Sequence, residues 1–545
     1  MDDKLICILH GYLLEGSGSN LWTRAIIKSL CSDGKIVHLM CQENHPERYD
    51  FISESFSYSS DGVVKKLLSR EVPYKGKCVM HKPELGDTLP VYVWDKYEEF
   101  SNVVPMIELP DDSIEDYLNR NVKVLKKIIS SNEIKSIHAN HAVLMSVVAH
   151  RVYISTGTPF AIMPHGSAIE YAVKKDERFL KLATSAFTEA KKIFVVGDEM
   201  HNRVKSVFPS IPNLDKKMIK LNLGVDTQLF KPISPQMRQK NILILCEKIS
   251  NLQKGKRPEQ TKQLQDNLLA TLQKDDLHKL ISSVSYDLKS PDADLESKLN
   301  QVDWKKEKII LFVGRLISKK GIHGIIAALP LILDKNPSTR LVIVGHGPLR
   351  EVLEIFLWAL ENGQIELVKN IAKWGEFLED AGQNSFQELE SFFEQLEKSN
   401  QINSYFEKAR NHIRQNKVIF TGYLTHNELR YLFPCCDVSV FPSVTVEAGP
   451  LVFLEALASG CFPLGTYFGG MAASIDSVAT ELPKNVSELM KISTAKEKMV
   501  FDIANNISDS LILGETYKKT LNNIAVQFYD WENVSRKLSR ELESM

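Results

Sequence analysis

Short apolar segments typical of buried strands alternate with amphipathic helical stretches in two separate parts of the chain. From residue 4 to about 226 these segments are KLICILH, KIVHLMC, SIHAN, PFAIMPHG, KKIFVVG and MIKLNLG, and after residue 307 they are IILFVGR, RLVIVGHG, KVIFTGY, DVSVFPS and CFPLGTYF. Strands that are buried on both faces and separated by helices form parallel sheets with right-handed crossovers. The sequence therefore predicts an α/β protein with two doubly wound parallel-sheet domains.

Two polar stretches interrupt this alternation, and both carry apolar residues at helical spacing. They are interpreted either as surfaces for a partner or acceptor, or as elements packed on their own domain. The predicted organisation is a first domain over 1–232, a polar helical insertion or linker over 233–307, a second domain over 308–515 with an insertion at about 355–416, and terminal helices over 516–545 that cross back to the first domain.

Charge and cysteine content exclude several classes of protein. The chain has 67 Lys and Arg against 68 Asp and Glu, a net charge of −1, so it lacks the basic field that a nucleic-acid partner requires. The eight cysteines mostly lie in apolar segments without metal-ligand spacing and are expected to be reduced and buried. No apolar segment approaches the roughly 20 residues that span a bilayer, and the N-terminus is more like a buried strand than a signal peptide. We expect a cytoplasmic protein and leave open both peripheral attachment to a membrane and the oligomeric state.

The segment GRLISKKG combines two cations with the start of a helix. Arg315 follows the predicted strand IILFVG directly, and Lys320 lies just before Gly321 and an apolar helix. A guanidinium, an ammonium and free backbone N–H groups suit a diphosphate and stabilise it as a leaving group. The alternative is a solvated basic loop without a ligand.

The segment PSVTVEAGPLVFLEALASG places two acids eight positions apart. Glu447 falls in a loop after the strand DVSVF, whereas Glu455 falls on the helix that Gly449 and Pro450 are expected to open. Carboxylates accept hydrogen bonds from sugar hydroxyls, so this pair suits a hexose and a ribose joined by the diphosphate. The alternative is that both acids lie on a solvated face.

These segments together resemble the retaining glycosyltransferases of family 4, which have the GT-B fold and an E-x7-E motif. Further matches are VGHGPLRE, FTGYLTHNELRYLF, GTYFGG and NLGVDTQLFKP. The resemblance implies two Rossmann-like domains facing across a cleft. It also implies that Arg315 and Lys320 hold the donor diphosphate, that Glu447 contacts the transferred sugar next to Gly449, and that Glu455 holds the nucleotide ribose.

The first domain offers three further candidates. The loop HGYLLEGSGSN contains Gly16 and Gly18, which let backbone approach a phosphate, and His165 follows the strand PFAIM at the edge where ligands bind. The resemblance implies that the glycine loop closes on the donor phosphates and that His165 contacts the transferred sugar. A dinucleotide site is the alternative for this loop, since Glu43 follows the next strand, but Leu21 stands where the third glycine of that fingerprint belongs.

The sequence thus predicts an enzyme that moves a hexose from a nucleotide-diphosphate sugar, taken as UDP-glucose, to an acceptor. No cofactor or metal is expected, because the two cations suffice for the diphosphate and the only D-x-D lies in the polar insertion. The acceptor stays open among a small metabolite, a glycan and a lipid-linked group. The stretch with Asp87, Tyr92, Trp94 and Tyr97 is interpreted either as an acceptor site or as an exposed hairpin. Alternative functions are a non-catalytic nucleotide-sugar sensor or assembly protein, an epimerase and a phosphorylase.

Overall fold

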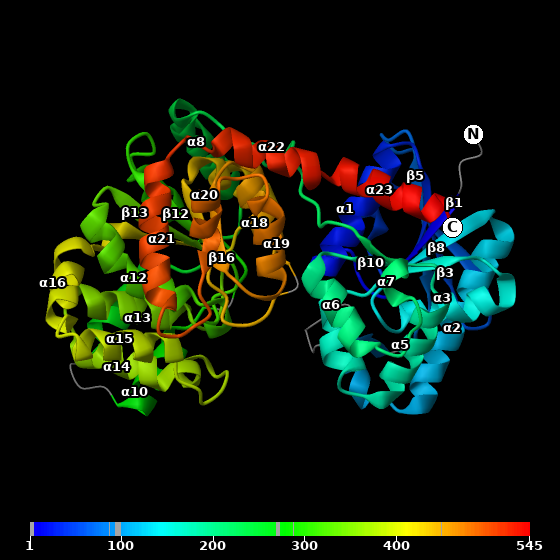
Figure 1. The fold of residues 1–545 in the computed structure, drawn as a ribbon, viewed down its shortest axis with the longest axis horizontal. Coiled ribbons are helices and arrows are strands. Elements are labelled where there is room, and N and C mark those ends of the chain that lie inside the picture. The colour runs from blue at the N-terminus through cyan, green and yellow to red at the C-terminus, as the bar shows by residue number, and fades with distance from the viewer. Residues whose placement is uncertain (1–4, 87, 93–99, 269–272, 287, 448) are drawn as a thin grey trace. The chain divides into compact units, whose positions relative to one another are not determined.

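The chain is divided into two compact units in a computed structural model (Figure 1). The N-terminal unit comprises Met1–Gly224 and Phe528–Met545, and the C-terminal unit comprises Val225–Gln527. The structure describes residues 5–86, 88–92, 100–268, 273–286, 288–447 and 449–545.

The N-terminal unit is built on a sheet whose described strands lie in the order β11-β10-β9-β8-β1-β2-β5-β3-β4. All neighbours in this sheet are parallel except β3 and β4. A separate pair, β6 and β7, is also parallel. The bounds are β1 Leu5–Leu9, β2 Ile36–Met40, β3 Ile52–Tyr58, β4 Val64–Ser69, β5 Lys77–Pro83, β6 Thr88–Val91, β7 Asn102–Pro105, β8 Ile134–Asn140, β9 Phe160–Met163, β10 Lys192–Val195 and β11 Met218–Lys220.

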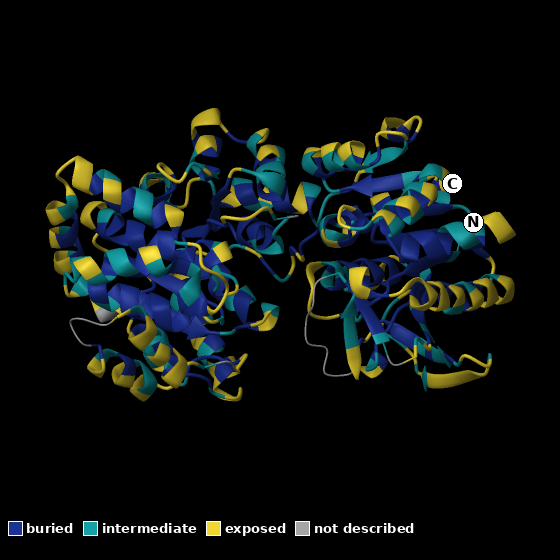
Figure 2. Ribbon diagram, turned by 90° about the horizontal axis from the view of Figure 1, so that it is seen from below, coloured by how far each residue is buried: buried dark blue, intermediate teal, exposed yellow. Residues whose placement is uncertain are grey.

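Amphipathic helices cover this sheet and bury their apolar faces against it (Figure 2). Of the terminal helices predicted over 516–545, only the last belongs to this unit, since the C-terminal unit extends to Gln527. This last helix, α23, packs on α1, where Ser29 and Ser535 share a hydrogen bond of 2.8 Å. The helices are α1 Gly18–Ser32, α2 Asp111–Ser131, α3 Met145–Thr156, α4 Gly166–Ala168, α5 Glu177–Glu189, α6 Asp198–Val207, α7 Leu214–Lys217 and α23 Trp531–Glu543.

The C-terminal unit contains a fully parallel sheet in the order β14-β13-β12-β15-β16-β17. Its central strands are buried on both faces because helices cover both, which explains their continuous apolar sequences. Numbered along the chain, this order is 3-2-1-4-5-6, the doubly wound order of dinucleotide-binding domains. The strands are β12 Lys308–Val313, β13 Thr339–Val344, β14 Val418–Gly422, β15 Val438–Phe441, β16 Phe462–Thr466 and β17 Lys491–Ile492.

The helices of the C-terminal unit include those of both polar stretches. They are α8 Arg238–Ser250, α9 Pro258–Asp266, α10 Lys274–Val284, α11 Leu295–Asn300, α12 Ile322–Lys335, α13 Arg350–Glu361, α14 Ile365–Trp374, α15 Gln387–Lys398, α16 Ile402–His412, α17 His426–Leu432, α18 Leu451–Ala458, α19 Gly469–Ala479, α20 Lys484–Ser487, α21 Met499–Leu513 and α22 Lys518–Phe528. Short 3-10 turns η5 (Ser318–Lys320) and η6 (Gly375–Glu379) connect some of them.

The division between the units falls at residue 224, earlier than the predicted 232, because the following residues pack into the C-terminal unit. Phe230 is 2% exposed and its ring contacts those of His426 and Phe433. The stretch 233–307 is likewise an integral part of this unit and not a linker. Arg238 forms a buried ion pair with Asp437 at 2.9 Å, so charged residues that suggested a solvated surface are partly internal.

The second insertion, predicted at about 355–416, packs on its own domain. Its predicted start falls within α13, which ends at Glu361, so residues 365–413 are called the second insertion below. Figure 1 shows its helices α14, α15 and α16 beside α12 and α13. The Tyr405 hydroxyl on α16 donates to the carbonyl of Ala327 on α12 at 2.8 Å. Its apolar face is buried, as its periodicity predicted, with Phe386, Leu389, Phe393 and Leu396 all at most 3% exposed.

Candidate functional site

The two predicted motifs of the C-terminal unit meet where its strand order reverses. Chain order runs from β12 outward through β13 and β14, then returns to β15 on the other side of β12. Arg315 and Lys320 follow β12, and Glu447 follows β15. Ligands of open α/β sheets bind outside the carboxyl ends of the strands at this switch point, so the topology places these residues where a ligand is expected.

The cation loop (residues 314–321) is fixed against the end of β15. Gly321 has φ +67°, and a Cβ at this position would lie 1.9 Å from the carbonyl oxygen of Pro442. The carbonyl of Lys319 accepts hydrogen bonds from the backbone N–H of Val444 and the hydroxyl of Ser443, both at 3.0 Å. The cation loop and the acid loop (residues 442–447) therefore form one connected structure.

Lys320 and Glu447 are in direct contact. Lys320 Nζ lies 2.6 Å from Glu447 Oε1, which also accepts from the Ser443 hydroxyl at 2.5 Å. The two side chains are 32% and 20% exposed, so solvent and a ligand can reach both. The structure thus brings one predicted cation and one predicted acid together at the ends of adjacent strands.

Arg315 is exposed and forms no ion pair with any residue that the structure describes. Its guanidinium is therefore not used in holding the described part of the fold. Gly449 is half-buried in the loop before α18. Pro450 is the cap residue before this helix and not its first residue, so the helix begins one position later than the sequence predicted.

Glu455 is held by a residue that was not predicted from the sequence. Its Oε1 lies 2.6 Å from Nδ1 of His426, while its Oε2 is buried without a hydrogen-bond partner among the described residues. The side chain is only 6% exposed, which rules out the solvated-face alternative for this acid. The segment LTHNEL carries the available signal, because Thr425 and Glu428 form a capping box that places His426 at the start of α17.

His165 belongs to the N-terminal unit, where it follows β9 with φ +50°. Its Nε2 lies 3.1 Å from Asn140 Oδ1. Burial, together with the neighbouring His10 and His138, lowers the pKa of His165 to about 3. The imidazole is therefore neutral at physiological pH, and Nε2 carries the proton because the amide oxygen can only accept.

Two further histidines occupy the corresponding switch point of this unit. His10 follows β1 and His141 follows β8, which are neighbouring strands. The His141 ring lies 4.7 Å from that of His165 and 5.8 Å from that of His10. His141 has φ +73°, is 1% exposed, and neither ring nitrogen has a hydrogen-bond partner among the described residues. The available sequence signal is a histidine directly after each strand, and only His165 was predicted from it.

Stability of this unit is expected to fall as pH falls from 6.5 to 5. Burial lowers the pKa values of His10 and His138 to about 4. It is also the main cause of the lowered pKa of His165. The unfolded chain protonates near pH 6.5, so it binds more protons than the folded protein in this window. We expect a loss of at least about 1 kcal/mol per buried histidine, measured as the free energy of urea unfolding. His165→Asn should weaken this dependence, and an identical dependence in both proteins would contradict the account.

Of the two glycines of the first domain, only Gly16 is required by backbone conformation, at φ +99°. Gly18 opens α1, and a Cβ there would meet no atom within 4 Å. Glu43, which supported the dinucleotide alternative, is a structural residue of this loop. Its carboxylate is 4% exposed and accepts hydrogen bonds from the backbone N–H groups of Leu14 at 3.0 Å and His45 at 2.9 Å, so it is not available to a ribose.

The predicted aromatic stretch is only partly described. Asp87, Trp94 and Tyr97 lie outside the described residues, and the Tyr92 hydroxyl donates to the carbonyl of Val143 at 2.5 Å. The hairpin alternative is wrong, because β6 and β7 pair in parallel and not antiparallel.

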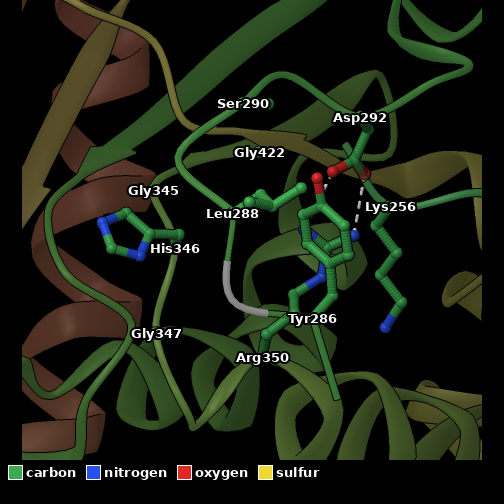
Figure 3. A pocket seen from close by; sticks show the side chains of 10 residues that line it. All are labelled: Lys256, Tyr286, Leu288, Ser290, Asp292, Gly345, His346, Gly347, Arg350 and Gly422. Atoms are coloured by element: carbon green, nitrogen blue, oxygen red, sulfur yellow. Dashed lines mark hydrogen bonds and ion pairs between the residues drawn. The ribbon is translucent and has the colours of Figure 1, made fainter. Parts of the chain in front are cut away.

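A small hollow of the C-terminal unit lies where β13 and β14 end (Figure 3). It is lined by Gly345–Gly347 and by residues of the first insertion, and at about 10 Å³ it is close to the size of one water. Asp292 lies beside it, 2.8 Å from the Arg350 guanidinium, as the dashed lines in Figure 3 mark. This aspartate of the D-x-D segment is therefore part of a buried ion pair.

Over the described ranges, no group of three His, Cys, Asp or Glu side chains is arranged to hold a metal ion. Nor does any helix in those ranges combine the length and the apolar character needed to cross a membrane.

Comparison with protein families assigns the part of the chain that holds the connected loops. Residues 296–481 match the family described as glycosyl transferases group 1. This part of the chain is therefore similar to group 1 glycosyltransferases, and we refer to residues 296–481 as the group 1 domain. The group 1 domain contains Arg315, Lys320, Glu447 and Glu455.

Among curated proteins, the chain is similar to an uncharacterised glycosyltransferase of Methanocaldococcus jannaschii, with 25% identity over 240 residues. This match covers 42% of the chain and 43% of that protein. A glycogen synthase of Mycobacterium tuberculosis is 26% identical over 183 residues, which are 33% of the chain and 31% of that protein. The matches thus span less than half the length of either relative.

Solved structures extend the similarity over the whole chain at the level of fold. Sucrose-phosphate synthase of Thermosynechococcus elongatus has a TM-score of 0.52 and 15% identity, covering 99% of this chain and 98% of that one. HepE of Anabaena in complex with UDP-glucose has a TM-score of 0.50 and 13% identity, covering 99% and 100%. These likenesses confirm the GT-B fold class. The finer assignment to family 4 stays a prediction.

Proposed function

We propose that the protein is a retaining glycosyltransferase that moves a hexose from a nucleotide-diphosphate sugar to an acceptor hydroxyl. The observation that carries this proposal is the contact of Lys320 with Glu447 at 2.6 Å, at the switch point of the group 1 domain. A cation for a diphosphate and an acid for a sugar are then adjacent, as the two ends of a single donor molecule require. UDP-glucose is the first donor to test, because HepE is described in complex with it.

In the proposed reaction the bond between the anomeric carbon and the diphosphate oxygen breaks, and the nucleoside diphosphate leaves with the electron pair. Arg315 and Lys320 stabilise the negative charge that develops on it. Lys320 exchanges its contact with Glu447 for the diphosphate when the donor binds. The departing phosphate oxygen takes the acceptor proton as the acceptor oxygen attacks from the same face.

Glu447 then faces the sugar, where a carboxylate stabilises the positive charge of the transition state. His165 supplies a neutral imidazole whose Nδ1 can accept a hydrogen bond from a sugar hydroxyl. Oε2 of Glu455, which has no hydrogen-bond partner among the described residues, is assigned as the acceptor for a ribose hydroxyl. Gly16, Gly18 and Gly449 are assigned to donor binding through their backbone. The diphosphate is neutralised by side-chain cations, so no metal is assigned to the reaction.

A panel of sugar nucleotides tests this proposal through thermal protection followed by product analysis. A donor at 100 times its Kd stabilises the protein by about 2.7 kcal/mol. The expected result is protection by one class of donor, slow release of nucleoside diphosphate, and retained activity in EDTA. Binding without any turnover would favour a sensor. Conversion of the donor in the absence of an acceptor would favour an epimerase, and a requirement for inorganic phosphate would favour a phosphorylase. Protection by no sugar nucleotide would overturn the proposal.

A further inference from the structure

The second insertion reaches the cation loop through a buried carboxylate. Glu379, the last residue of η6, accepts the backbone N–H of Ser318 at 2.9 Å and 3.1 Å to its two oxygens, and it also accepts the Ser318 hydroxyl. Glu379 is 5% exposed and Ser318 is 4% exposed. Ser318 opens the turn that ends with Lys320, so a residue of the insertion fixes the backbone from which this cation projects.

A second contact joins the insertion to the helix that follows the cation loop. His323, in the first turn of α12, is 2% exposed and bonds through Nε2 to the carboxylate of Glu388 on α15. Its ring stacks on that of Phe386 with centroids 4.3 Å apart. The insertion therefore holds the turn before Gly321 and the first turn after it.

Burying the carboxylate of Glu379 costs free energy that its hydrogen bonds to Ser318 have to offset. Burial raises the pKa of this carboxyl, and the carboxyl lies against Ser318 of the loop that is assigned to a diphosphate. An apolar contact would have closed the surface at lower cost, because a buried charge is costly unless it is paired and hydrogen-bonded. What a carboxylate adds is a fixed direction for the N–H and the hydroxyl of Ser318.

The effect extends to the acid loop. The carbonyl of the next residue, Lys319, accepts the backbone N–H of Val444, and the single hydroxyl proton of Ser443 is shared between this carbonyl and Glu447 Oε1. Hydrogen bonds and the backbone between Ser318 and Lys319 thus connect Glu379 to the acid loop.

We propose that the second insertion stabilises the donor-binding conformation of the cation loop. Glu379 is a positioning residue that fixes this loop in the conformation that binds the diphosphate. This inference rests on the proposed function and adds a role for the insertion. The insertion then has a role beyond packing on its own domain, and it is not a surface for a partner. Glu379 acts through Ser318 and does not contact the donor.

The test compares the affinities of uridine and UDP by calorimetry, since their ratio isolates the contribution of the diphosphate. Glu379→Ala is expected to lower the preference for UDP over uridine at least tenfold and to leave the uridine affinity unchanged. Glu379→Gln should restore most of this preference, because its amide can still accept the Ser318 N–H. Glu376→Ala is the matched control, since Glu376 lies in the same turn but bonds to Asn384 within the insertion.

Loss of uridine and UDP affinity to the same extent would show a merely structural role and overturn the inference. An unchanged preference in Glu379→Ala would also overturn it while leaving the proposed function intact. A wild-type protein that binds a different base is tested with the matching pair, such as adenosine and ADP. No preference for any diphosphate in the wild type would defeat both proposals. If Glu379→Ala does not fold, Ser318→Ala is the second variant, because it removes only the hydroxyl contact. It is expected to lower the preference for UDP over uridine several-fold, and an unchanged preference would overturn the inference.

Discussion

Replacing Glu447 by glutamine is expected to lower kcat for sugar transfer at least about 100-fold, or about 2.7 kcal/mol of transition-state stabilisation. The amide has nearly the same shape but no negative charge to stabilise the positive charge that develops on the sugar. The fold should persist, because Glu447 and Lys320 are 20% and 32% exposed and a partly exposed ion pair contributes at most about 1 kcal/mol.

The same variant should bind UDP at least as tightly as the wild type does. Glutamine releases Lys320 from its ion pair, so the ammonium no longer has to exchange partners when the diphosphate binds. Steady-state kinetics and calorimetry separate these effects, and we expect a large loss in kcat without a loss in UDP affinity. Transfer by Glu447→Gln at the wild-type rate would show that Glu447 has no catalytic role.

Replacing Arg315 by alanine is expected to lower kcat/KM at least about 100-fold without a change in thermal stability. Within the described part of the chain this guanidinium is exposed and pairs with no carboxylate, so the fold does not depend on it. Its loss should reduce both the binding of the diphosphate and the stabilisation of its charge as it leaves. Initial rates over a range of donor concentrations give KM and kcat, and so separate the effect on donor binding from the effect on the reaction step.

Lys319→Ala is the matched control for Arg315→Ala. Lys319 is an exposed cation of the same loop, and the hydrogen bonds to the acid loop use its carbonyl and not its side chain. It should keep near-wild-type kinetics. Equal losses in the two variants would mean that the general positive charge of the loop matters and not the placement of Arg315.

The sequence was sufficient to predict the parallel sheets, because strands buried on both faces leave a continuous apolar signal that polar helices interrupt. It also assigned Lys320 and Glu447 to loops that follow strands of the same domain, but their direct contact is known only from the structure, in which β12 and β15 are neighbours. Periodicity does not identify which neighbouring strand a given one pairs with. The hairpin alternative for the stretch with Asp87, Tyr92, Trp94 and Tyr97 failed for this reason, since β6 pairs in parallel with β7.

The polar insertions were harder to interpret, because sequence patterns do not distinguish a solvated charge from a buried, paired one. Arg238, Asp292 and Glu379 all lie in stretches that suggest surface helices, and each is at most 5% exposed. Their partners are distant in sequence, as with the 199 positions between Arg238 and Asp437. His426 was missed for a related reason, because the capping box places it at the start of a helix but does not show that it contacts Glu455.

A crystal structure of the wild-type protein with bound UDP tests the central claim most directly. The account predicts that the diphosphate oxygens lie within hydrogen-bond distance of both Arg315 and Lys320, that the Lys320–Glu447 contact is broken, and that a ribose hydroxyl bonds to Glu455 Oε2. A diphosphate bound elsewhere, or a Lys320–Glu447 pair that stays closed in the complex, would contradict it.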